Sequence, residues 1–199
     1  ADAVQNDKAD ALINDAIKEL PEKMEARLYC NLTKDQASLY QAVVDDMMKQ
    51  INSAAGIARK GLILTTLMKL KQVCNHPTLM NKDKKALGKR SGKLNRLEEL
   101  LEVMLDGDDA CLIFTQFSSW GGMLSEHLGK RFGEEVAFLH GGTPKKERDK
   151  MVQHFQSDEG PRVFVLSLKA GGVGLNLTKA NQIVHFDRWW NPAVEDQAS

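Results

Sequence analysis

The second half of this chain alternates short apolar runs with helical patterns, and this alternation limits the folds open to it. Two helical patterns, Ser118–Phe132 and Pro144–Gln156, separate runs that are too short for helices and that turn residues bound. Strands that alternate with helices are typical of parallel βαβ units. We therefore predict an α/β lobe over residues 91–199, with a doubly wound parallel sheet flanked by helices. Its strands would be Ala110–Phe114, Val136–Leu139, Val163–Leu168 and Ile183–Phe186.

The first half of the chain predicts a mainly helical addition to this lobe. Residues 1–21 form a polar lead-in, and residues 22–90 begin with an alternating stretch, Met24–Leu32, that predicts a linking strand. Thr33 and Gln36 have the spacing of a capping box, and apolar residues at helical spacing follow up to Ile51. A second helix ends near His76-Pro77. We interpret residues 33–77 as a helical hairpin and assign it no chemistry.

Charge and cysteine content narrow the classes of partner. Lys+Arg and Asp+Glu both number 27, so a nucleic-acid surface has to be a local patch. Residues 81–96 hold seven basic residues against one acid, which is typical either of such a patch or of a solvated linker. Cys30, Cys74 and Cys111 lack pairing or metal spacing and indicate buried free thiols in a reducing compartment. No apolar run approaches the roughly 20 residues that a membrane span needs, so we expect an intracellular protein.

A glycine-rich loop, Lys169–Asn176, follows the third predicted strand. Ligands of open α/β sheets bind outside the carboxyl ends of strands, and Gly171, Gly172 and Gly174 would allow a close backbone approach. The chain nevertheless contains no GxxxxGK[ST] string, and the GxGxxG pattern fails at its third glycine. The loop therefore predicts either a site for a ligand held partly by another element, or a tight turn.

Small and polar residues also gather at the other predicted strand ends. Backbone amides at helix starts, together with Thr, Ser and Lys side chains, bind phosphate oxygens well. His140 and His185 lack partners at metal spacing, so we predict no zinc site. Trp189 and Trp190 either anchor a partner surface or both pack in the core. The polar strand ends are Thr115-Gln116-Phe117-Ser118, His140-Gly141-Gly142-Thr143, Ser167-Leu168-Lys169 and Asp187-Arg188.

These residues occur within longer strings that resemble a known family. The chain is similar to the C-terminal RecA-like lobe of Swi/Snf-type ATP-dependent DNA translocases of helicase superfamily two, over nearly its whole length. The matching strings are LKQVCNHP (residues 70–77), SGKL (91–94), LIFTQF (112–117), LHGGTPKKERDKMVQHFQ (139–156) and the stretch from Leu166 to Ser199.

The resemblance implies a mechanism and a set of site residues. ATP with Mg²⁺ would lie between two RecA-like lobes, with its phosphates on the P-loop of the first lobe. The second lobe would close over ATP and grip the backbone of double-stranded DNA. The implied DNA-backbone residues are Thr115, Gln116, Gly141, Gly142, Ser167 and Lys169. Those implied at the nucleotide cleft are Gly172, Gly174 and Asn176, and those implied in docking to the first lobe are Trp189 and Trp190.

Two departures from the family pattern shape our expectations for this chain. It carries no first lobe, and the family's motif VI arginines would follow Ser199. We therefore expect a truncated lobe that binds no cofactor by itself and has no catalytic residue or ATPase activity of its own. Two alternatives stay open, namely a strand-separating superfamily-two helicase and a non-enzymatic module that binds a protein. We favour a prokaryotic source, for which we expect a cytoplasmic, nucleoid-associated protein. A eukaryotic source would imply a nuclear protein. We also expect a DNA-bound protein as a further partner.

Overall fold

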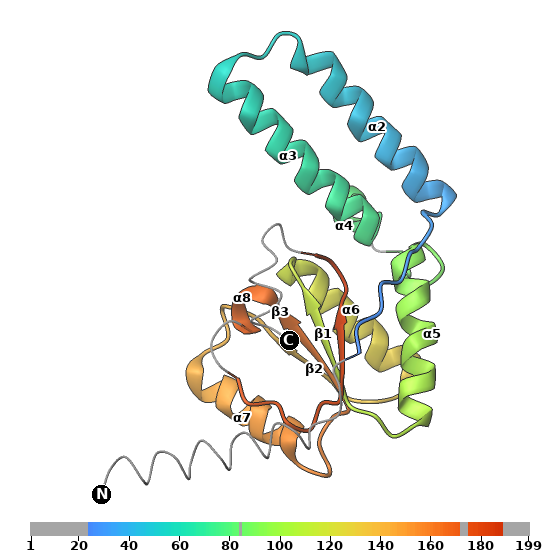
Figure 1. Cartoon of the computed structure of the whole chain (residues 1–199), viewed down its shortest axis with the longest axis vertical. Coiled ribbons are helices and arrows are strands. Elements are labelled where there is room, and N and C mark those ends of the chain that lie inside the picture. The colour runs from blue at the N-terminus through green and yellow to red at the C-terminus, as the bar shows by residue number, and fades with distance from the viewer. Residues whose placement is uncertain (1–23, 84, 172–174, 189–199) are drawn as a thin grey trace, which may run out of the picture.

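A four-stranded parallel sheet forms the body of the molecule, and a helical hairpin projects from it (Figure 1). The computed structural model describes residues 24–83, 85–171 and 175–188. The strand order is β2-β3-β1-β4, and all three neighbouring pairs are parallel. This confirms the predicted α/β fold. The strands are β1 (Cys111–Thr115), β2 (Val136–Leu139), β3 (Val163–Ser167) and β4 (Gln182–His185).

Helices cover both faces of the sheet, as a doubly wound fold requires. Successive side chains of a strand point to opposite faces. Accordingly, Cys111 and Ile113 pack with Trp120 in one apolar cluster, whereas Leu112 and Phe114 belong to a second cluster. The helices of the first cluster are α5 (Gly92–Asp106) and α6 (Ser118–Phe132), and those of the second are α7 (Lys145–Gln156) and the short α8 (Leu168–Gly171).

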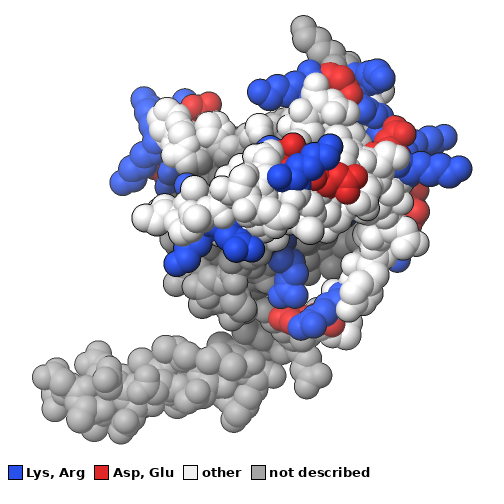
Figure 2. All heavy atoms as spheres, turned by 90° about the horizontal axis from the view of Figure 1, so that it is seen from above, with Lys and Arg blue, Asp and Glu red and all other residues white. Residues whose placement is uncertain are grey.

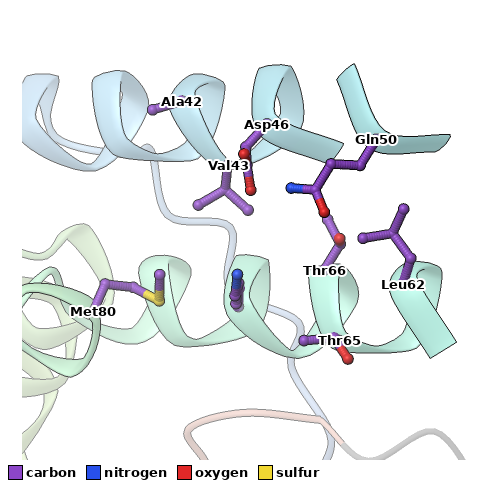
Figure 3. A pocket seen from close by; sticks show the side chains of 9 residues that line it. Ala42, Val43, Asp46, Gln50, Leu62, Thr65, Thr66 and Met80 are labelled. Carbon is purple, nitrogen blue, oxygen red and sulfur yellow. The ribbon is translucent and has the colours of Figure 1, made fainter. Parts of the chain in front are cut away.

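The hairpin consists of two long antiparallel helices, α2 (Lys34–Ile51) and α3 (Gly56–Asn75), followed by the short α4 (Thr78–Asn81). The predicted capping box is confirmed, because the Thr33 hydroxyl accepts from the Gln36 amide while the Gln36 side chain accepts from the Thr33 amide. A pocket of about 390 Å³ lies between α2 and α3 (Figure 3). Asp46, Gln50 and Leu62 are among its lining residues, and none of the lining residues comes from the sheet.

The predicted linking strand at residues 24–32 is wrong. This segment is extended but joins no sheet within the described residues, and most of its side chains are exposed. Alternation alone does not make a strand, because the backbone also needs a partner ladder. The segment instead runs past the start of α5, where a Cβ on Gly92 would lie 1.9 Å from the carbonyl oxygen of Asn31.

Gln36 holds the base of the hairpin against the lobe. Its side chain is fully buried, and its Nε2 donates to the carbonyl oxygens of Val73 and Cys74 at 2.8 and 3.1 Å. Its Oε1 accepts from the Gly92 amide at 3.1 Å. The last carbonyl groups of α3, which have no partner within the helix, are therefore satisfied by a side chain from α2.

Three of the seven basic residues in the stretch 81–96 bond to other side chains. Arg90 forms two hydrogen bonds with Asp83, and its guanidinium lowers the pKa of that carboxyl group. Lys93 is half-buried and donates to the Asn75 side chain, and Arg96 pairs with Glu99. Figure 2 shows Lys and Arg in several separate groups on one face, most of them with Asp or Glu nearby.

Cysteine placement confirms the prediction only in part. All three cysteines are free thiols, but only Cys111 is buried, and Cys30 and Cys74 are half-buried. None of the described helices is both long and apolar enough to cross a membrane.

Candidate nucleic-acid and nucleotide interface

All four polar strand ends lie at one edge of the sheet. Parallel strands place their carboxyl ends together, and the register makes Thr115 the direct neighbour of Ser167. Leu139 pairs with Leu166, so the loop that begins at His140 follows at the same level. The predicted clustering of these junctions is therefore confirmed, whereas their binding of phosphate stays a prediction.

The junction between β1 and α6 combines a buried residue with a half-buried one. Thr115 is fully buried, and its hydroxyl donates to Asp187 Oδ2 at 2.7 Å. The Gln116 amide donates to Asp187 Oδ1 at 2.8 Å, and its side-chain oxygen accepts from Lys71 Nζ at 3.1 Å. In this arrangement Thr115 positions Asp187 and does not reach the surface. A direct contact between Thr115 and DNA stays a prediction.

The loop between β2 and α7 exposes backbone. Gly141 and Gly142 are both exposed, and a Cβ on Gly141 would meet nothing within 4 Å. Three hydrogen bonds close the loop: the Thr143 amide donates to the His140 carbonyl, the His140 amide to the Thr143 hydroxyl, and the Gly142 amide to His140 Nδ1. Pro144 precedes α7, and no side chain caps this helix, so the amides of its first turn lack a side-chain acceptor among the described residues.

The junction after β3 holds Ser167 and Lys169. Ser167 is buried, and its hydroxyl has no hydrogen-bond partner among the described residues. Lys169 lies on α8 and is exposed. This edge therefore has a cation at its surface and a buried hydroxyl that bonds to none of the described residues.

The nucleotide side of the glycine loop is described only at Asn176, which is exposed. Gly172, Gly174, Trp189 and Trp190 lie outside the described residues. Among the residues that the structure describes, no group of three or more His, Cys, Asp or Glu side chains could hold a metal ion.

The sequence did not predict two polar residues, Asn75 and Lys93, that bond to each other beside this edge. The Asn75 side chain donates to Asp187 Oδ2 at 2.8 Å, and its oxygen accepts from Lys93 Nζ at 3.0 Å. Burial lowers the pKa of Lys93, and the nearby Asp187 carboxylate opposes that shift. A polar residue at the end of an apolar helix was the available signal, but nothing in the sequence pairs Asn75 with a residue 112 positions away.

The sequence comparisons agree with the fold just described. Residues 92–199 match the family model of the helicase conserved C-terminal domain, and residues 8–79 match that of the SNF2-related domain. The first match alone covers more than half of the chain. The chain therefore belongs to the helicase C-terminal domain family, and it is the C-terminal lobe of an SNF2-family ATPase.

Individual relatives narrow this placement. The chain is 49% identical over 182 residues to the putative ATP-dependent helicase/translocase YwqA of Bacillus subtilis (strain 168), covering 90% of this chain and 20% of that protein. It is 48% identical to the SWI2/SNF2 ATPase C-terminal domain of Sulfolobus solfataricus, with a TM-score of 0.81 and coverage of 88% and 76% of the two chains. The ATPase core of that archaeon in complex with double-stranded DNA matches at 46% identity and a TM-score of 0.83, covering 92% of this chain and 38% of the other. The chain thus spans about a fifth of the length of the curated relatives that it matches.

Proposed function

We propose that this chain is the second motor lobe of an ATP-dependent translocase that moves along double-stranded DNA. The carrying observation is the single sheet edge that brings together the ends of all four strands, with Lys169 exposed on it. The likeness to an SWI2/SNF2 core in complex with double-stranded DNA supports the choice of ligand.

On the DNA side, the lobe would contact phosphate groups rather than bases. Lys169 would supply a cation, the backbone at Gly141 leaves room for close approach, and α6 and α7 both begin at this edge without a side-chain cap. Gln116, Gly142 and Ser167 complete the proposed track. Contacts of this kind position a protein without reading sequence, so binding is expected to be salt-sensitive and tolerant of sequence.

On the nucleotide side, the lobe would complete a site that a first lobe begins. The chain contains no GxxxxGK[ST] string to cradle phosphates, so ATP and Mg²⁺ would be held chiefly by the P-loop lobe. Hydrolysis of ATP supplies the free energy for stepping. This chain would close over the nucleotide with its glycine loop, which includes Gly172, Gly174 and Asn176. Trp189 and Trp190 would dock on the first lobe. By itself the chain should release no phosphate.

The test uses a protein that contains both lobes. We expect its ATPase activity to rise when duplex DNA is added. We also expect the protein to displace no strand of that duplex. Lys169→Ala should raise the DNA concentration for half-maximal stimulation by about three- to tenfold, because one phosphate contact is lost. Lys130→Ala is the matched control: Lys130 is an exposed lysine near the end of α6, at the opposite edge of the sheet, and should change little.

Other outcomes would point to the alternatives. Strand displacement that depends on ATP would favour a helicase. The proposal would be overturned if DNA did not change the ATPase activity. It would also be overturned if the Lys169 and Lys130 variants needed the same DNA concentration for half-maximal stimulation.

A protein-binding role has one observation in its favour. The α3 residues Ile57 and Leu64 are 90% and 63% exposed, and exposed apolar side chains that form a patch mark protein-binding sites. If the DNA response were absent, binding of a DNA-bound protein through this helix would become the leading function.

A further inference from the structure

The Asp187 carboxylate joins three separate segments of the chain. It is buried, two residues after the end of β4, and accepts from the Thr115 hydroxyl and the Gln116 amide at the end of β1. Its third donor, the Asn75 side chain, comes from the last residue of α3 in the hairpin. A buried carboxylate is costly without such donors, so the arrangement resists any displacement that would remove one.

Asn75 is held in one orientation. It is fully buried, its amide nitrogen faces Asp187, and its amide oxygen accepts from Lys93 Nζ. Its backbone carbonyl accepts from the Ser91 hydroxyl at 2.6 Å, and the same hydroxyl caps α5. The end of α3 is therefore tied to the start of α5 as well as to the sheet edge.

Contacts nearer the surface extend the same connection. Lys71 of α3 donates to the Gln116 side chain at 3.1 Å and to the Arg188 carbonyl at 2.6 Å. The Gln116 side-chain nitrogen also lies 3.4 Å from Met68 Sδ. One helix of the hairpin thus contacts the loops after β1 and β4, which are neighbouring strands of the sheet.

We infer that Asn75 and Asp187 are positioning residues, which make the hairpin and the two strand-end loops move as one body. This inference rests on the proposed function, in which the loop after β1 follows the DNA backbone. A force applied to the hairpin would then shift the Gln116 loop directly, and a shift of that loop would reorient the hairpin. The buried pair makes this coupling specific, because an amide donor has to face a carboxylate acceptor.

The test exchanges the two side chains. Asn75→Asp places two carboxylates against each other. Asp187→Asn replaces one of the two acceptor oxygens by an amide donor, so at least one of the three donors loses its acceptor. The double variant restores a donor facing an acceptor between positions 75 and 187, and leaves Lys93 beside a carboxylate. In the two-lobed protein, each single variant should lower DNA-stimulated ATPase about tenfold, and the double variant should recover most of that loss.

A second readout on the 199-residue chain needs no catalysis. Hydrogen exchange of the Gln116 amide should speed up about tenfold or more in each single variant and slow down again in the double variant. Lys71→Met keeps the buried Asn75–Asp187 pair and should speed up Gln116 exchange by a smaller factor. This variant replaces the single variants if they do not fold.

The outcomes separate this inference from the proposed function. If the unmodified two-lobed protein lacks DNA-stimulated ATPase, the proposed function fails, and the exchange data alone decide the coupling. If DNA stimulation is present but the single variants keep both it and the slow Gln116 exchange, the coupling is refuted. A double variant no better than either single variant would also refute it.

Discussion

The imidazole of His76 stacks on the indole of Trp120, with ring centroids 5.2 Å apart and an interplanar angle of 17°. His76 follows the last residue of the hairpin helix α3, and Trp120 lies in the first turn of α6. Both side chains are fully buried. The hairpin therefore docks on the motor lobe through an aromatic contact as well as through the polar group around Asp187.

Acidification should loosen this contact. His76 Nδ1 accepts from the Thr78 amide, so Nε2 carries the proton toward the Leu87 carbonyl. A second proton, on Nδ1, would face the Thr78 N–H and break that hydrogen bond. Burial, the main cause, lowers the pKa of His76 below its ordinary 6.5. The unfolded chain then binds the proton more readily, so this contribution to stability is complete above about pH 6.5 and is lost as pH falls toward the folded pKa.

His76→Gln tests that dependence. We expect it to cost about 1–3 kcal/mol near pH 7.5, from lost stacking and hydrogen bonding, and to flatten the fall in stability below pH 6.5. Urea unfolding at several pH values measures both effects. His154→Gln is the control, because the His154 side chain is 47% exposed and its ring bonds to Glu135 at the surface. Equal pH profiles for the two variants would contradict the prediction.

Gly92→Ala should disturb the linker that leads to the hairpin. The new Cβ would lie 1.9 Å from the Asn31 carbonyl oxygen, which is backbone and cannot rotate away. We expect a loss of about 1–3 kcal/mol in unfolding free energy and faster proteolysis near residues 24–33. Gly61→Ala is the matched control inside α3, where a Cβ meets nothing within 4 Å, and it should stabilise by roughly 0.5–1 kcal/mol. Similar effects of both substitutions would show that the close approach does not exist.

Ser167 and Thr115 should separate DNA contact from structural support. Ser167→Ala removes a hydroxyl with no partner among the described residues, so the unfolding free energy should change by less than about 1 kcal/mol. Thr115→Val removes the donor to Asp187 and should cost about 1–3 kcal/mol. In the two-lobed protein, Ser167→Ala should still weaken DNA stimulation about three- to tenfold, because in the proposed track this buried hydroxyl turns toward a phosphate when DNA binds. Unchanged DNA stimulation would remove Ser167 from the proposed track.

The three thiols should react in a defined order. Burial raises the pKa of Cys111 to about 12, and burial also raises the pKa of Cys74. Because the thiolate is the nucleophile, a disulfide reagent at pH 8 should label Cys30 first, Cys74 more slowly and Cys111 only after unfolding. Mass spectrometry of timed samples measures this. Early labelling of Cys111 would mean that β1 opens in the native state.

Prediction and structure agree where an element depends on residues close together in the sequence, and they differ where it depends on distant ones. The helix Ser118–Phe132 and the strand Val136–Leu139 have the bounds that the sequence predicts, because hydrophobic spacing over a few residues is sufficient to define them. The strand expected at residues 24–32 does not form, because a strand needs a partner that spacing cannot supply. The Asn75–Asp187 contact was not predictable, since it joins residues 112 positions apart.

By itself, the sequence determined the parallel α/β lobe, the helical hairpin and the strand ends at which polar residues gather. These features depend on periodicity, capping and turn chemistry, which act locally along the chain. Tertiary structure alone decided that Thr115 faces inward, that Ser167 is its neighbour, and that Asn75 of α3 and Lys93 of α5 support the edge. Such choices depend on which donors face a buried carboxylate, and that is settled only when distant segments pack together.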